Sequence, residues 1–187
     1  MKVVYFFLIL TLLASCGKPE APSKKLHILR MNVNREPVSM DPRQGSEYVS
    51  STLHFMLFEG LMRLNPDGSL TPAQAKSVEI SDDRKTYTFH LRDTKWSDGT
   101  PVTAYDFEKA WKKILSPHFA APSASLLYAI RNAEKAKRGT ISLEDVGIHS
   151  TDPRTLIVEL ESPTPYFLSL VSFCVFFPVK QTADENP

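Results

Sequence analysis

The chain has 187 residues, of which 42% are hydrophobic and 23% charged, and its formal net charge at pH 7 is +1. This length and composition are typical of one substantial soluble globular domain. The near-zero charge and the lack of charge runs argue against a nucleic-acid-binding protein, so we expect no nucleic-acid partner.

The N-terminus, MKVVYFFLILTLLASC, places one lysine before an apolar run over residues 3–13. A membrane-spanning helix needs about 20 apolar residues, so this run predicts a cleaved secretory signal instead. The residues around Cys16 resemble the lipobox of bacterial lipoproteins, which implies cleavage before Cys16 and a diacylglycerol on its sulfur. The alternative is a plain secretory signal with an incidental cysteine. We therefore expect a signal peptide over residues 1–15 and a lipidated, polar tether over residues 16–25.

The folded part is expected to begin with LHILRMNV, residues 26–33, whose length and apolar content are typical of a buried strand. A proline-containing loop follows and leads into a helix, for which Ser50 or Ser51 is the predicted N-cap. Gly60 stands where this helix should end. The next segment, NPDG at 65–68, predicts a tight turn.

Two hairpins are predicted farther along the chain. Residues 77–80 and 86–92 flank the polar turn SDDRK, and the second of these strands alternates apolar and polar residues. Residues 147–150 and 155–160 flank a turn that contains the Asp-Pro dipeptide. Both patterns are typical of half-buried antiparallel strands.

The stretch WSDGTPVTAYDF contains an indole, two aspartates and two threonines within a few residues, a composition that resembles a catalytic or ligand-binding loop. Trp96 opens the stretch, and the Asp98-Gly99 dipeptide favours a tight turn with positive φ. A structural task accounts for these residues without any chemistry.

A capping box explains the remainder of this stretch. With Thr103 as N-cap, Asp106 stands at the N3 position, where its carboxylate can accept a hydrogen bond from the N-cap amide. Val102 and Phe107 then occupy the two positions of a hydrophobic staple. The helix that follows carries one apolar stripe: Phe107, Ala110, Trp111, Ile114 and Leu115. We predict that the stretch is scaffold.

Toward the C-terminal end of the sequence, residues 162–173 predict a short apolar helix, and CVFFPV at 174–179 predicts one more buried strand. Cys174 lies in this apolar region. With Cys16 lipidated it has no partner for a disulfide, so we expect a buried, unreactive thiol.

Catalytic signatures are missing from the sequence. The five histidines lack the short spacings of a zinc site, and the chain contains no HExxH, GxSxG, CxxC, P-loop or GxGxxG motif. We therefore expect neither an enzyme nor a bound metal or cofactor.

Four motifs resemble one family. The segment at 86–117, TYTFHLRDTKWSDGTPVTAYDFEKAWKKILSP, is similar to the most recognisable part of bacterial extracellular solute-binding proteins of the oligopeptide- and dipeptide-binding type, family 5. SMDP at 39–42, LFEGLMRL at 57–64 and SPTPYFLSL at 162–170 resemble the same family in the same order. The oligopeptide-binding lipoproteins of peptide ABC importers are the nearest group.

The resemblance implies a mixed α/β fold, a periplasmic-binding-protein-like type II clamp of two lobes. This chain would hold only the N-terminal part of that clamp, because family members run to more than twice its length. Residues 26–45 would start the hinge lobe (domain I), residues 46–168 would form a small second subdomain, and residues 169–187 would re-enter the hinge lobe. Without the opposite lobe, four residues would be left on open strand edges or apolar faces: Leu29, Met31, Phe173 and Phe176.

The family also implies the site and the partners. Ser46, Glu47 and Tyr48 match the place where oligopeptide-binding relatives line the cleft, although those relatives often have a carboxylate at the place of Ser46. Ser123 stands where a tyrosine packs near the peptide. An extended oligopeptide would be held mainly through main-chain hydrogen bonds and delivered to ABC permease subunits. The protein would be lipid-anchored in the cell envelope, on the periplasmic or extracytoplasmic side.

Two other interpretations stay open. The chain could be a truncated, non-transporting lipoprotein remnant or an interaction protein, because the missing lobe removes the clamp. It could also bind another solute, such as dipeptides or nickel.

Overall fold

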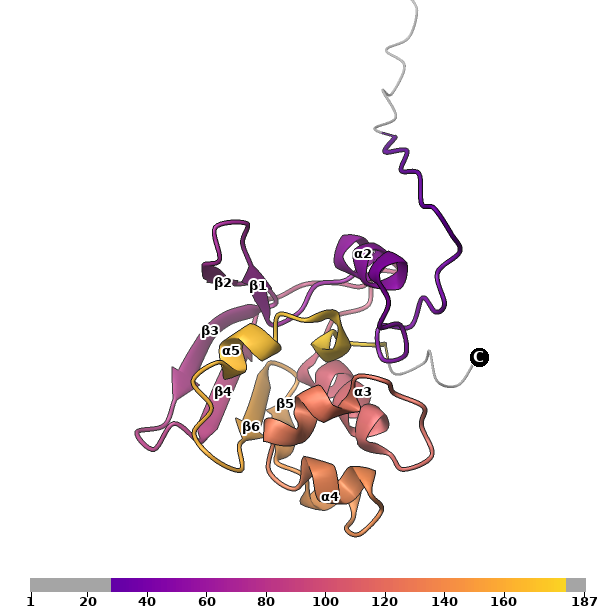
Figure 1. Cartoon of the computed structure of the whole chain (residues 1–187). Helices are drawn as coiled ribbons and strands as arrows, with labels where there is room; N and C mark the ends of the chain where they lie inside the picture. The colour runs from indigo at the N-terminus through magenta and orange to yellow at the C-terminus, as the bar shows by residue number, and fades with distance from the viewer. Residues whose placement is uncertain (1–27, 181–187) are drawn as a thin grey trace, which may run out of the picture. The chain divides into compact units, whose positions relative to one another are not determined.

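The structure, a computed structural model, describes residues 28–180, which fall into two units, 28–32 and 33–180. Cys16, with the predicted signal peptide and tether, lies outside the described residues. The second unit combines antiparallel strands with short helices, and so has the mixed α/β character that we predicted (Figure 1).

A four-stranded antiparallel sheet in the order β3-β4-β6-β5 forms the centre of the second unit. Its strands are β3 (Ala75–Ile80), β4 (Thr86–Leu91), β5 (Ile148–Asp152) and β6 (Thr155–Glu159). In β4 the alternate residues Tyr87, Phe89 and Leu91 are buried, because they point to the same face of the sheet. Both predicted hairpins are confirmed.

A second, two-stranded sheet pairs β1 (Met62–Leu64) with β2 (Leu70–Pro72). The NPDG turn joins these strands, and Gly68 has a φ of 82°, which a residue with a side chain rarely adopts. The predicted tight turn is therefore confirmed.

Helix α3 (Ala104–Leu115) packs against β5 and β6, as Figure 1 shows. The predicted capping box forms at its N-terminus, and the helix ends at the C-cap Ser116, directly before Pro117. The whole predicted stripe is buried, since no member is more than 1% exposed. The apolar periodicity therefore identified the face of α3 that covers the sheet.

The remaining elements are short. They are α2 (Tyr48–Leu57), η2 (Ala124–Ala129), α4 (Ala133–Lys137), η3 (Leu143–Asp145), α5 (Phe167–Leu170) and η4 (Cys174–Phe176), where η marks a 3₁₀ helix.

Helix α2 begins earlier than we predicted. Its N-cap is Glu47, whose side chain accepts a hydrogen bond from the amide of Ser50, so neither Ser50 nor Ser51 is the cap. The helix ends before Phe58, and Gly60 lies beyond it. Glycine is needed there for space, because a Cβ atom at Gly60 would stand 2.7 Å from the ring of Phe177.

The strand predicted over residues 26–33 is not found at residues 28–33, which have no regular structure. Leu29 is 78% exposed and Met31 is 43% exposed, as expected for apolar residues without a covering face. The physical reason is that a strand needs a neighbour for its backbone N–H and C=O groups, and the described residues of this first unit supply none.

The strand predicted at 174–179 is also wrong, although the segment is buried. Residues Cys174–Phe176 form η4, and the backbone carbonyl of Phe176 accepts a hydrogen bond from Trp111 instead of a neighbouring strand. Phe176 is fully buried, contrary to our expectation, whereas Phe173 is 46% exposed as expected. Cys174 is a free, buried cysteine, and burial raises the pKa of its thiol.

Candidate functional site

The N-terminal end of α2 holds three of the four residues that we expected to contact a peptide. Glu47 accepts hydrogen bonds from the amide of Ser50 at 2.7 Å and from the amide of Val38 at 2.9 Å. The hydroxyl of Ser50 also donates to it. These bonds, led by the Ser50 hydroxyl, lower the pKa of Glu47 to about 2. Its carboxylate is therefore ionised at neutral pH and ties the start of α2 to the preceding loop.

The two neighbours of Glu47 lie open to solvent. Ser46 is exposed, and Tyr48 is 80% exposed although it is a large aromatic residue. Ser46 and Tyr48 can therefore meet a ligand, whereas Glu47 serves to fix the backbone between them.

Ser123, the fourth expected residue, comes from a different segment. It is the N-cap of η2, is half-buried, and its carbonyl accepts a hydrogen bond from the amide of Leu126 at 3.1 Å. Its segment follows the loop that leaves the C-terminal end of α3.

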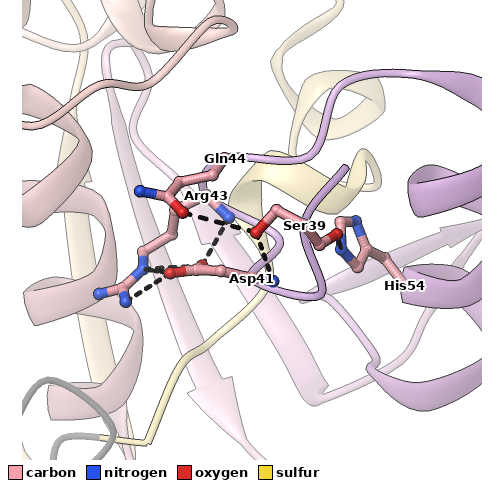
Figure 2. A network of polar contacts seen from close by, with 5 residues as sticks. All are labelled: Ser39, Asp41, Arg43, Gln44 and His54. Atoms are coloured by element: carbon pink, nitrogen blue, oxygen red, sulfur yellow. Dashed lines mark hydrogen bonds and ion pairs between the residues drawn. The ribbon is translucent and has the colours of Figure 1, made fainter. Parts of the chain in front are cut away.

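The loop at residues 39–45, which directly precedes Ser46, is held by a polar network (Figure 2). The carboxylate of Asp41 accepts a hydrogen bond from the backbone amide of Arg43 at 2.9 Å. It also accepts hydrogen bonds from the guanidinium of Arg43, the shortest of which is 2.7 Å. The hydroxyl of Ser39 accepts the amide of Asp41 at 3.1 Å. The SMDP motif thus forms a tight, internally bonded turn.

His54, a residue of α2, anchors this turn to the helix. Its side chain is fully buried, and Nε2 donates to the carbonyl of Ser39 at 3.1 Å (Figure 2). The other ring nitrogen, Nδ1, has no hydrogen-bond partner among the described residues. Burial lowers the pKa of His54, although Asp41 and Glu47 oppose this effect, so the ring is neutral at neutral pH. A Cβ atom on Gly45 would lie 2.5 Å from the ring, so glycine is required there.

The WSDG stretch has the structural role that we predicted. The carboxylate of Asp106 accepts hydrogen bonds from the amide and hydroxyl of Thr103 at 2.8 Å and 3.0 Å, and from the indole of Trp96 at 3.4 Å. Asp98 accepts the amide of Thr100 at 3.0 Å, and the next residue, Gly99, has a φ of 86°.

The same stretch also reaches a distant segment. Lys180 forms an ion pair with Asp98 and thereby holds the pKa of that carboxyl well below its ordinary value. Phe107 and Trp111 continue the scaffold as fully buried residues of α3.

An apolar surface around Phe58 escaped our sequence analysis. Phe58 borders three cavities, of about 330, 630 and 650 Å³. Phe55 lines the first two and Trp96 the last two. The run FMLF at 55–58 carried the available signal, because four successive apolar residues cannot all face one side of a helix. Indeed Phe55 is 55% exposed and Leu57 is 65% exposed.

Within residues 28–180, no cluster of three histidine, cysteine, aspartate or glutamate residues could hold a metal ion. None of the helices described there has the length and apolar content that crossing a bilayer requires.

Comparison with known proteins identifies the family. Residues 69–187, more than half of the chain, match the middle region of the bacterial extracellular solute-binding proteins, family 5. The chain belongs to this family. The resemblance that the four motifs indicated is thereby confirmed.

Two relatives of this family 5 chain come from Bacillus subtilis. The oligopeptide-binding protein OppA is 41% identical over 195 residues, which cover 99% of this chain and 36% of OppA. The dipeptide-binding protein DppE is 44% identical over 162 residues, which cover 86% of this chain and 30% of DppE. The chain thus spans about a third of the length of these curated relatives. They are solute-binding proteins and not enzymes.

Solved structures agree with this assignment. The substrate-binding domain of an oligopeptide ABC transporter from Bacillus anthracis superposes with a TM-score of 0.80 at 37% identity, over 83% of this chain and 31% of that one. Haemophilus influenzae OppA in complex with RPPGFSPFR gives a TM-score of 0.77 at 38% identity, over 80% and 30% of the two chains. The predicted fold class, a mixed α/β part of a solute-binding protein, is confirmed.

Proposed function

We propose that this family 5 chain belongs to the peptide-capturing component of an ABC importer. The observation that carries the proposal is its 41% identity to the oligopeptide-binding protein OppA of Bacillus subtilis along 99% of the chain. The component would take up extended oligopeptides outside the cytoplasm and deliver them to permease subunits for transport.

The geometry at the start of α2 supports Ser46 and Tyr48 as peptide-contacting residues and Glu47 as the residue that fixes the backbone between them. An extended peptide is bound largely through backbone hydrogen bonds, which need a rigid partner with free polar groups. The cap at Glu47 supplies the rigidity, and the open side chains of Ser46 and Tyr48 supply contact area. Ser123, on its separate segment, would meet another part of the same ligand.

The domain arrangement and the anchor are part of the same proposal. We assign residues 26–45 to the start of the hinge lobe, residues 46–168 to a small second subdomain and residues 169–187 to a return into the hinge lobe. Cys16 would carry the lipid, and residues 16–25 would tether the protein to the cell envelope on the extracytoplasmic side.

Dipeptides are the second candidate ligand. The observation that favours them is the 44% identity to the dipeptide-binding protein DppE of Bacillus subtilis. A site for dipeptides must recognise both charged ends of its ligand, whereas a site for longer peptides can rely on the backbone between them.

Peptide-dependent thermal stabilisation tests the binding proposal. A ligand that binds only the folded state at one hundred times its Kd adds about 2.7 kcal/mol of stability. We expect trialanine and RPPGFSPFR to raise Tm and dialanine to have little effect. A rise with dialanine alone would favour the second candidate. No rise with any peptide would favour an interaction lipoprotein.

A matched pair of tyrosine variants locates the site. Tyr48→Ala should weaken binding of trialanine by about fivefold, because it removes a large exposed contact surface. Tyr166→Ala removes another exposed tyrosine, 63% exposed, on a different element and should leave the affinity unchanged. Equal effects of the two variants would contradict the proposed site.

Intact-mass analysis of protein extracted from its native cells tests the anchor. We expect a species that lacks residues 1–15 and carries a diacylglycerol, and a Cys16→Ser variant without that lipid. A wild-type protein cleaved elsewhere and without lipid would refute the lipoprotein assignment. The same mass reports how far the native protein extends.

A further inference from the structure

The two segments proposed to contact peptide lie far apart in the sequence, and the side chain of Arg43 connects the loops that precede them. The loop at residues 39–45 leads directly into Ser46. Within it, the guanidinium of Arg43 donates several hydrogen bonds of 2.7 to 3.0 Å to the carboxylate of Asp41 (Figure 2). Arg43 is only 5% exposed although it is charged. A buried, planar guanidinium bonded to a carboxylate holds one orientation.

The far side of Arg43 meets the loop that leads to Ser123. Its Cζ atom stands over the ring of Phe119, 5.3 Å from the ring centroid, which is within the range of a cation–π interaction. The contact joins the loop that precedes residues 46–48 to the loop that precedes Ser123.

Phe119 is itself firmly placed. The ammonium group of Lys137 donates to three carbonyls in and after the last turn of α3: Ile114 at 2.9 Å, Ser116 at 2.9 Å and Phe119 at 2.7 Å. The amide of Phe119 donates to the carbonyl of Ser116 at 3.2 Å. The backbone of Phe119 is thus held next to the C-terminal end of α3, and the contact of Arg43 with its ring brings the 39–45 loop to this end of the helix.

From this geometry we propose that Arg43 is a positioning residue for peptide binding, which sets the distance between residues 46–48 and Ser123 through its simultaneous contacts with Asp41 and Phe119. The inference rests on the proposed function. Arg43 acts through the two segments and need not touch the peptide. A ligand that spans both segments then binds a preorganised pair, and avoids the entropic cost of ordering each one.

A double-mutant cycle isolates the Arg43–Phe119 contact from the other interactions of both residues. Arg43→Lys keeps the charge and loses the planar fork, while Phe119→Leu keeps an apolar side chain and loses the ring. We expect each variant to weaken binding of trialanine, followed by calorimetry, by about fivefold. The double variant should bind trialanine at most about tenfold more weakly than the wild type, because the second change removes a contact that is already lost. Losses that multiply would overturn the proposal.

Amide hydrogen exchange of the peptide-free protein supplies a readout that does not depend on binding. We expect Arg43→Lys to accelerate exchange across the contact, at residues 120–126, and Phe119→Leu to accelerate exchange at residues 44–50. Acceleration confined to each variant's own segment would overturn the coupling. If the wild-type protein binds no peptide, the proposed function fails, and this exchange experiment alone decides whether the two segments are coupled.

Two control variants separate positioning from general stability. Lys113→Met removes the other cation near the same ring, whose Nζ lies 5.6 Å from the centroid, without touching the 39–45 loop. Arg154→Lys weakens a different arginine anchor, which pairs with Asp93. Neither control should alter peptide affinity or exchange at residues 44–50. An effect equal to that of Arg43→Lys would show that any weakened anchor suffices, and would refute the special role of Arg43.

Discussion

The indole N–H of Trp111 donates to the backbone carbonyl of Phe176 at 2.9 Å, and the two rings meet edge to face with centroids 5.1 Å apart. Both residues are fully buried. This contact joins α3, which covers the sheet, to η4, so that the segment after α5 is held by a side chain and not by strand pairing.

Trp111→Phe should therefore lower the free energy of unfolding by about 2–4 kcal/mol, because it leaves a cavity and an unpaired buried carbonyl. Trp96→Phe is the matched control. That indole is half-buried and its hydrogen bond to Asp106 is long, at 3.4 Å, so we expect a loss below about 1 kcal/mol. Urea denaturation compares the two variants, and equal losses would mean that the Trp111 bond has no special weight.

The capping box at α3 gives a second prediction. Asp106→Ala removes the acceptor for the amide and hydroxyl of Thr103, so it should destabilise the protein by about 1–2 kcal/mol. Asp82→Ala, in the exposed turn between β3 and β4, makes the same change of charge and should stay within about 0.5 kcal/mol of the wild type. A loss at Asp82 as large as that at Asp106 would indicate a general charge effect.

Glu47 should make stability depend on pH in the acid range. Its pKa is lowered from 4.5 to about 2 by hydrogen bonds, first that from Ser50, so the folded state favours the ionised form. The resulting stabilisation is fully present above pH 4.5 and is lost as the pH falls toward 2. The Tm of Glu47→Gln should therefore fall less steeply over this window than that of the wild type. Glu36→Gln, at an exposed position in the preceding segment, should keep the wild-type slope.

His54 should act in a higher pH range. Because burial lowers its pKa below 6.5, the unfolded chain binds a proton more readily than the folded protein. Stability is therefore highest when the ring is neutral and decreases as the pH falls below 6.5. We expect His54→Gln to flatten this decrease, and His118→Gln, at an exposed position, to preserve it. Measuring Tm between pH 7 and pH 5 tests this prediction. If Tm of His54→Gln fell with pH as steeply as that of the wild type, His54 would not be the group responsible.

The candidate site could be predicted only in part. The spacing of the SMDP and LFEGL motifs placed Ser46 and Tyr48, and both proved to be exposed on either side of the N-cap of a helix. The contact between Arg43 and Phe119 had no such signal. Nothing in either local pattern indicates a partner so distant in the chain, and a half-buried phenylalanine in a loop is common.

Short-range chemistry explains the features that the sequence determined by itself. The Thr103–Asp106 capping box, the turn at Gly99 and the alternating burial of β4 each depend on residues only a few positions apart, so their patterns suffice.

Tertiary structure decided the apolar segments. Both segments 28–33 and 174–179 were predicted to be buried strands, yet the first is exposed and the second is buried and begins with the 3₁₀ helix η4. Hydrophobicity drives a segment toward burial without direction, whereas a strand also requires a neighbour for each backbone N–H and C=O group. Whether that neighbour is another strand, or a side chain such as Trp111, depends on which parts of the chain meet in space.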